Sequence, residues 1–185
     1  MMTELSLNVL DVAENSVKAK ATLIEISVIA DTQSDLLTIT ISDNGSGMNE
    51  EQLKRVTDPF YTTRTTRKVG LGVSFFKLAA EASGGSFNIT STENVGTKVC
   101  AEFSISNIDR MPLGDMCGTI HALVTLNEQI DFVYTFAVDD KSFALDTREF
   151  REILGDVSFS VPEISAYIKE YLVENTAEVQ GDTVL

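Results

Sequence analysis

The sequence predicts a two-layer α/β sandwich, in which one mixed sheet is covered on one face by helices. Apolar residues recur at helical spacing in 5–19 and 71–83, and neither run is interrupted by Pro. The four runs 22–30, 36–42, 86–91 and 97–105 instead have the composition of strands. With 185 residues and 43% hydrophobic content, the chain is long enough to bury a core.

The first predicted helix, residues 5–19, carries two polar residues on one face. Asp11 and Asn15 are four positions apart, so a carboxylate and an amide lie side by side. Mg²⁺ takes oxygen ligands, keeps several waters and usually shares phosphate oxygens, so an amide oxygen here suits a metal site. A solvated helix face is the alternative interpretation.

An acidic turn with two glycines follows the strand-like run 36–42. In this turn, residues 43–48, the carboxylate of Asp43 can accept a hydrogen bond from an exocyclic amine. Gly45 and Gly47 let the backbone bend sharply and approach a flat ring. The pattern therefore indicates a nucleotide pocket, although it also suits an ordinary turn.

The segment 58–70 is polar and basic, and predicts a mobile loop. Arg64, Arg67 and Lys68 fall within five positions of a chain whose formal net charge is −14. Such a local reversal of charge indicates a nearby anion, and phosphate is the natural candidate because Arg, Lys and Thr all bind it. A surface loop with chance basic residues is the alternative.

The helix 71–83 opens with glycines at Gly70 and Gly72. Free backbone amides at a helix N-terminus favour a phosphate. The motif is neither a Walker loop nor the Gly-x-Gly-x-x-Gly of dinucleotide folds, and both alternatives are weakened.

Taken in order, these segments resemble the GHKL ATP-binding domain shared by gyrase B, the heat-shock chaperone, histidine kinases and MutL. The resemblance covers about residues 5–105 and is closest to histidine kinases around 58–74. It implies a Bergerat-type fold that binds ATP and Mg²⁺, with Asn15 as the metal ligand and Asp43 reading the adenine amine. The nucleotide contacts that it implies are Asn15, Asp43, Gly45, Gly47, Met48, Phe60, Thr63, Arg64, Lys68, Gly70, Leu71, Gly72 and Thr97.

The position of the catalytic base departs from the family pattern. ATP-hydrolysing relatives place a glutamate one helical turn before the Mg²⁺ asparagine, and this chain has Asp11 there. Aspartate is one methylene shorter, so its reach to the attacking water depends on small displacements. Asp11 is the candidate base, whereas Glu14 points to another face of the helix and is interpreted as structural.

Two functions remain open. The resemblance implies a kinase or weak ATPase, and its phospho-acceptor would lie on a separate protein partner, because the only histidine, His121, falls in a strand-like alternation, 119–125. The alternative is a non-catalytic nucleotide-sensing module, in which ATP changes how the protein meets a partner.

The chain divides by charge into an ATP-binding domain, 1–108, and an acidic α+β domain or sheet extension, 109–185. The first part has thirteen acidic and nine basic residues, and the second has fifteen and five. In the second part we expect strands at 117–126, 131–138 and 142–145, then helices at 147–154 and 162–178, the last capped by Ser160.

The composition of the chain indicates its cellular location and argues against some classes of partner. No run approaches the length of a membrane span and no signal peptide is evident, so we expect a cytoplasmic protein without a membrane partner. The acidic surface argues against nucleic acid, and the oligomeric state, a homodimer included, is open. Cys100 and Cys117 form no metal or redox motif and are expected to be reduced and buried.

Overall fold

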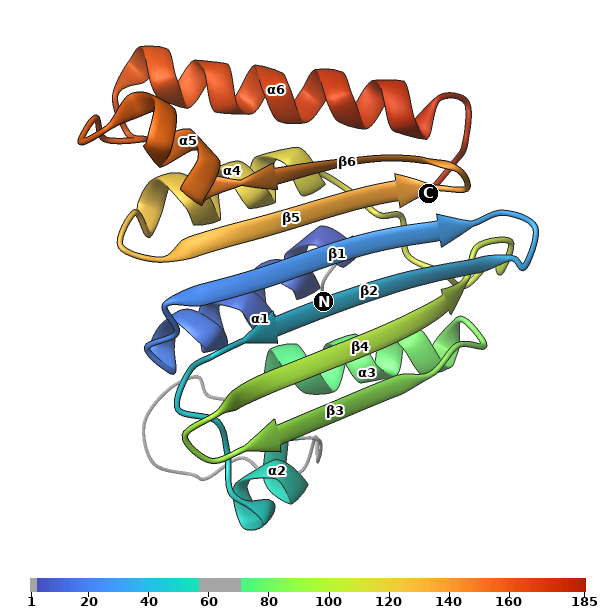
Figure 1. Ribbon diagram of the computed structural model, residues 1–185. Helices are drawn as coiled ribbons and strands as arrows, with labels where there is room; N and C mark the ends of the chain where they lie inside the picture. The colour runs from blue at the N-terminus through green and yellow to red at the C-terminus, as the bar shows by residue number, and fades with distance from the viewer. Residues whose placement is uncertain (1–2, 57–70) are drawn as a thin grey trace.

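The computed structural model describes residues 3–56 and 71–185, the side chain of Leu71 excepted, and its centre is a six-stranded mixed sheet (Figure 1). The strand order is β3-β4-β2-β1-β5-β6. β1 and β5 are parallel, and the other neighbours are antiparallel. The strands are β1 (Leu23–Asp31), β2 (Leu36–Asp43), β3 (Phe87–Thr92), β4 (Gly96–Ser104), β5 (Asp131–Val138) and β6 (Lys141–Asp146).

Helices α1, α3 and α4 lie behind the sheet in Figure 1, so helices and sheet form two layers. The burial of β1 agrees with this arrangement: Ile24, Ile26 and Val28 are buried, whereas Glu25 and Ile29 on the other face are exposed. The predicted two-layer α/β sandwich is therefore confirmed. The helices are α1 (Leu5–Lys18), α2 (Glu50–Val56), α3 (Leu71–Ala82), α4 (Met116–Leu126), α5 (Thr147–Leu154) and α6 (Pro162–Gln180).

The N-terminus of α1 is held by the backbone of a distant segment. Glu4, at the N-cap, makes no side-chain capping bond. The amides of Leu5 and Ser6 instead donate to the carbonyl oxygens of Pro112 and Leu113, both at 2.9 Å. These bonds satisfy two of the orphan donors of the first turn, and they tie α1 to the segment that leads into α4.

Residues 109–185 add β5 and β6 to the same sheet and share its hydrophobic core. α6 packs on β5 and β6 beside α4, with Ile168 and Leu172 buried. The apolar residues at helical spacing in this helix therefore lie on the face that packs on the sheet.

The prediction of a strand at 117–126 was wrong, because these residues form α4. The β-branched residues of this run favoured a strand, but Met116, Ile120 and Leu123 also follow helical spacing, and all three are buried. The carboxylate of Asp115 accepts a bond from the amide of Gly118 at 2.7 Å, which caps the helix. His121 consequently lies in a helix and not in a strand.

Three smaller expectations also differ from the structure. Val161, not Ser160, is the N-cap of α6, and Ser160 is bonded to Ser158 in the preceding loop. α2 was not predicted, since it has no buried residue and hence no apolar periodicity. Cys100 and Cys117 are free, as expected, but only half-buried.

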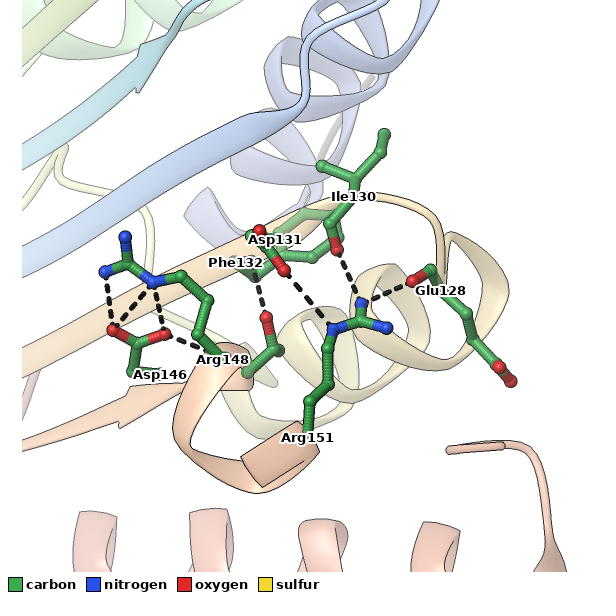
Figure 2. Close-up of polar contacts among 8 residues, drawn as sticks. Glu128, Ile130, Asp131, Phe132, Asp146, Arg148 and Arg151 are labelled. Carbon is green, nitrogen blue, oxygen red and sulfur yellow. Dashed lines mark hydrogen bonds and ion pairs between the residues drawn. The ribbon is translucent and has the colours of Figure 1, made fainter. Parts of the chain in front are cut away.

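α5 is anchored to the end of the sheet by Arg151 (Figure 2). The guanidinium donates to the carbonyl oxygens of Glu128 and Ile130, and its Nε lies 3.3 Å from Oδ1 of Asp131. It also lies over the ring of Phe159, 4.9 Å from the ring centroid. One side chain thus connects α5 to two loops and to the start of β5.

Among the helices of residues 3–56 and 71–185, none combines the length and the apolar character that crossing a membrane would require.

Candidate functional site

A cavity of about 340 Å³ lies between the helices and the sheet. Its volume is within the range of small-molecule sites. It is bordered by the C-terminal half of α1, the end of β2, the turn that follows, and parts of α3, β3 and β4. The lining residues are Val12, Asn15, Ser16, Lys18, Ala19, Ile41, Asp43, Ser46, Gly47, Met48, Val56, Val73, Ile89, Thr97 and Val99.

Asp43, the last residue of β2, is held by two hydrogen bonds. Its Oδ1 accepts from the amide of Gly45 at 2.8 Å, and its Oδ2 accepts from the hydroxyl of Ser16 at 2.5 Å. The first bond is local to the turn, whereas the second reaches across from α1. The carboxylate therefore has a fixed orientation in the wall of the cavity, as a binding group requires.

The turn after Asp43 packs so closely on β3 that it requires glycine. Gly47 has φ +60°, and a Cβ there would lie 2.0 Å from the carbonyl oxygen of Thr92. Any side chain at this position would displace the turn from the sheet. Gly47 thus shapes the wall of the cavity through the absence of a side chain.

A second network positions Thr97, which stands opposite Asp43 in the β2–β4 register. Ser91 Oγ lies 2.8 Å from Thr97 Oγ1 and accepts a bond from the Met48 amide, also at 2.8 Å. Its oxygen is 3.0 Å from the carbonyl oxygen of Gly96. Ser91 therefore connects the glycine turn to the β3–β4 hairpin, next to Met48 and Thr97, which line the cavity.

Asp11, the candidate base, lies one turn before Asn15 on α1 and contacts the start of α3. A Cβ on Gly72 would come within 2.7 Å of the Asp11 Cβ atom. As far as the described residues define the cavity, Asn15 is in its lining and Asp11 is not.

The structure brings together several of the residues singled out in the sequence. Asn15, Asp43, Gly47, Met48 and Thr97 line one cavity, and the amide of Gly45 holds Asp43. Leu71 and Gly72 begin α3, beside α1. Phe60, Thr63, Arg64, Lys68 and Gly70 lie outside the described residues.

Sequence reasoning missed Ser16 and Ser91. The signal that was available for Ser16 is its position at helical spacing among the apolar residues of 5–19, which predicts burial, and the residue is only 4% exposed. Ser91 had no signal, since an isolated serine in a polar strand is common. Its role depends on the register of β3 and β4, which places it beside Thr97.

The donor set fits a metal ion that is shared with a ligand's phosphates. Within residues 3–56 and 71–185, no group of three or more His, Cys, Asp or Glu side chains could hold a metal by itself. Asn15 lines the cavity, and its side chain has one amide oxygen that could serve as a ligand. Such a sparse set of protein oxygens is typical of Mg²⁺ bound mainly through phosphate and water.

Comparison with a protein-family model gives a match over residues 2–107, more than half of the chain, and the model is described as the histidine kinase-, DNA gyrase B- and HSP90-like ATPase. Among curated proteins, a putative sensor protein of Shewanella frigidimarina (strain NCIMB 400) is 34% identical over 85 residues, which is 44% of this chain. A putative sensor histidine kinase, NtrY-like, of Rickettsia prowazekii (strain Madrid E) is 26% identical over 107 residues, or 58% of this chain. The matches span only 13% and 18% of those two relatives.

Solved structures show the same fold. The Aquifex aeolicus MutL ATPase domain complexed with ADP matches with a TM-score of 0.51 and 16% identity, over 83% of this chain and 70% of that domain. The N-terminal domain of a DNA repair protein matches with a TM-score of 0.58 and 19% identity, over 98% of this chain and 58% of the other.

Proposed function

Because the chain belongs to the family of histidine kinase-, DNA gyrase B- and HSP90-like ATPases, we propose that its cavity binds ATP with Mg²⁺ and passes the γ-phosphate to a separate protein partner, or slowly to water. The observation that carries the proposal is the fixed carboxylate of Asp43, opposite Thr97 in a cavity of about 340 Å³. An acceptor held in this way suits the exocyclic amine of adenine.

The phosphate end of the ligand would lie toward Asn15 and the start of α3. The Asn15 amide oxygen would hold Mg²⁺, which supplies charge neutralisation for the phosphates when it is bound. Phosphate oxygens would meet the N-terminal amides of α3, where the helix dipole favours an anion. Asp11, which packs against Gly72 at the start of α3, would be the general base.

The proposed phospho-acceptor lies on another protein. His121, the only histidine in the sequence, is half-buried on α4, and its Nε2 lies 2.8 Å from Ser165 Oγ on α6. A contact of this kind suits a structural residue. The names of the curated relatives are those of sensor proteins and sensor kinases, which favours a role in signal transduction. The cytoplasmic location stays a prediction from the sequence.

The test is binding followed by turnover. Calorimetry with ATP and ADP in the presence of Mg²⁺ comes first, and the same samples are then followed for ADP formation and for transfer of γ-labelled phosphate to protein. Asp11→Asn is expected to lower turnover without abolishing binding. Glu14→Gln, a nearby exposed carboxylate paired with Lys18 at 3.3 Å, is the matched control and should behave as wild type.

Absence of adenine-nucleotide binding would overturn the proposal as a whole. If neither the wild type nor Asp11→Asn released phosphate and no protein became labelled, the enzymatic part alone would be excluded; equal release by both would exclude only the role of Asp11.

The second candidate is a nucleotide sensor, which one specific contact favours. The amides that begin α1 are bonded to the carbonyls of Pro112 and Leu113, and this segment leads into α4. The helix that carries Asn15 is thus joined to the acidic half of the chain. Hydrogen exchange with ATP, ADP and no nucleotide tests the idea, since a sensor requires a nucleotide-dependent change in α4 or α6. Identical exchange in all three states would contradict it.

A further inference from the structure

Ser16, which is buried, and Asp43, which is half-buried, form a pair between α1 and β2. The hydroxyl of Ser16 donates to Oδ2 of Asp43 at 2.5 Å, and both residues line the cavity. Ser16 is only 4% exposed, so little water reaches its side chain. The other carboxylate oxygen is held by the Gly45 amide at 2.8 Å. Each oxygen of Asp43 thus has its own protein donor.

The direction of this hydrogen bond determines what the pair offers to a ligand. A carboxylate accepts hydrogen bonds and has none to donate, so the single hydroxyl hydrogen of Ser16 is committed to Asp43. The remaining lone pairs of both residues are the groups available to the cavity. This corner therefore presents acceptors, which suit an N–H donor and repel a carbonyl oxygen.

We propose that Ser16 is a positioning residue that sets base selectivity: by holding the Asp43 carboxylate, it makes the cavity prefer a nucleotide with a 6-amino purine over one with a 6-oxo purine. The inference rests on the proposed binding of ATP. It assigns the discrimination to a pair of side chains, in which Asp43 meets the base and Ser16 keeps Asp43 in place.

The loss of the Ser16 hydroxyl would mainly reduce the preference for a 6-amino purine nucleotide over a 6-oxo one. Without its hydroxyl, Oδ2 of Asp43 loses a buried donor, and the carboxylate is free to rotate or to take up water. A carboxylate that is less firmly held forms a weaker hydrogen bond with the 6-amino group of a purine. It also repels a 6-oxo group less strongly. The affinity for ATP should therefore fall while the affinity for inosine triphosphate stays the same or rises.

The test compares the dissociation constants of ATP and inosine triphosphate, both with Mg²⁺, for the full chain and its variants. Ser16→Ala is expected to reduce the preference for ATP about tenfold, the typical effect of one hydrogen bond to a charged group. Ser16→Thr retains the hydroxyl and should restore most of the preference. Ser6→Ala is the matched control, because Ser6 is a buried serine on the same helix whose hydroxyl donates to Glu4.

The outcomes separate this inference from the proposed function. An unchanged preference in a Ser16→Ala protein that unfolds at the wild-type temperature would overturn the inference and leave ATP binding intact. Equal loss of both affinities would also overturn it, because it would show a structural role alone. A reduced preference in a protein that transfers no phosphate would support the inference while the catalytic proposal fails. Wild-type protein that binds neither nucleotide would overturn both.

Discussion

Gly72 on α3 packs directly against Asp11 on α1. A Cβ added at Gly72 would lie 2.7 Å from the Cβ atom of Asp11 and 3.1 Å from its Oδ2. Atoms of real side chains do not approach so closely, so glycine at this position allows α3 to start beside the candidate base. The close approach gives a reason for Gly72 that is independent of phosphate binding.

Gly72→Ala should therefore destabilise the protein. Replacing a helical glycine by alanine normally stabilises a helix by about 0.5–1 kcal/mol, but here the clash with Asp11 should cost about 1–3 kcal/mol. Denaturant unfolding measures the effect. In the double variant Asp11→Gly/Gly72→Ala the side chain that clashes with the new Cβ is removed, and part of the loss should be recovered. A Gly72→Ala protein more stable than wild type would contradict the packing argument.

Asp43→Asn should weaken ATP binding by more than ~1 kcal/mol, because an amide NH₂ would turn a donor toward the adenine amine or toward the present donors of Asp43. Calorimetry measures the change. Asp140→Asn, which removes the same charge from the exposed β5–β6 turn, is the control and should bind as wild type. Unchanged affinity in Asp43→Asn would place the base elsewhere.

His121→Ala should lower stability without affecting phosphate transfer. Nε2 of His121 lies 2.8 Å from Ser165 Oγ and 3.1 Å from the Ser165 carbonyl oxygen, which joins α4 to α6. The loss of this contact should cost about 1 kcal/mol in the free energy of unfolding. Ser165→Ala should produce a similar loss, and the two effects should not add. Disappearance of labelled phosphate in His121→Ala alone would instead identify His121 as an acceptor.

Arg151→Lys should destabilise the anchoring of α5 by about 1–2 kcal/mol, because a lysine cannot reproduce the planar fork that reaches two carbonyls and stacks on Phe159. Arg148→Lys is the matched control. Arg148 is exposed and pairs with Asp146 at 2.6 Å (Figure 2), and an ion pair of this kind contributes less than about 1 kcal/mol. Equal effects of the two substitutions in thermal unfolding would contradict the assigned role of Arg151.

The environment of Asp35 leads us to expect that the folded protein loses stability in acid. Hydrogen bonds from the Ser104 hydroxyl and the Ser106 amide lower the pKa of Asp35 below its ordinary value of 3.8. The folded state therefore binds this proton less readily than the unfolded state does. The resulting stability is present above pH 3.8 and disappears as the pH falls through the lower, folded-state pKa. Asp35→Asn should flatten this part of the pH profile of unfolding; an unaltered profile would assign the acid transition to other carboxylates.

The sequence was sufficient to predict an element where its hydrophobic pattern fits only one kind of secondary structure. The apolar spacing in 5–19 and the alternation in β1 each allow only one buried face, so the sandwich followed from them. It was insufficient in 116–126, where apolar residues at 116, 120, 123 and 124 fit a helix and the β-branched composition fits a strand. Tertiary packing of α4 between α1 and α6 decided the outcome.

Within the candidate site, the sequence predicted residues that stand out by their residue type in a motif. It missed residues whose hydrogen bonds depend on which elements become neighbours in the fold. A carboxylate before two glycines is visible as a motif, and Asp43 was found in this way. Ser16 and Ser91 depend on which strands and helices become neighbours, and no local spacing encodes that relationship.

The parallel pairing of β1 with β5 gives the acidic half of the chain a protective role. In a protein truncated after residue 108, β1 would become an edge strand of the sheet. Its backbone N–H and C=O groups would then be exposed, next to the apolar side chains of Ile24, Ile26 and Val28. Such a strand is a template for intermolecular pairing and aggregation. Residues 109–185 cover this edge by pairing β5 with β1. Their negative charge also makes copies of the protein repel one another.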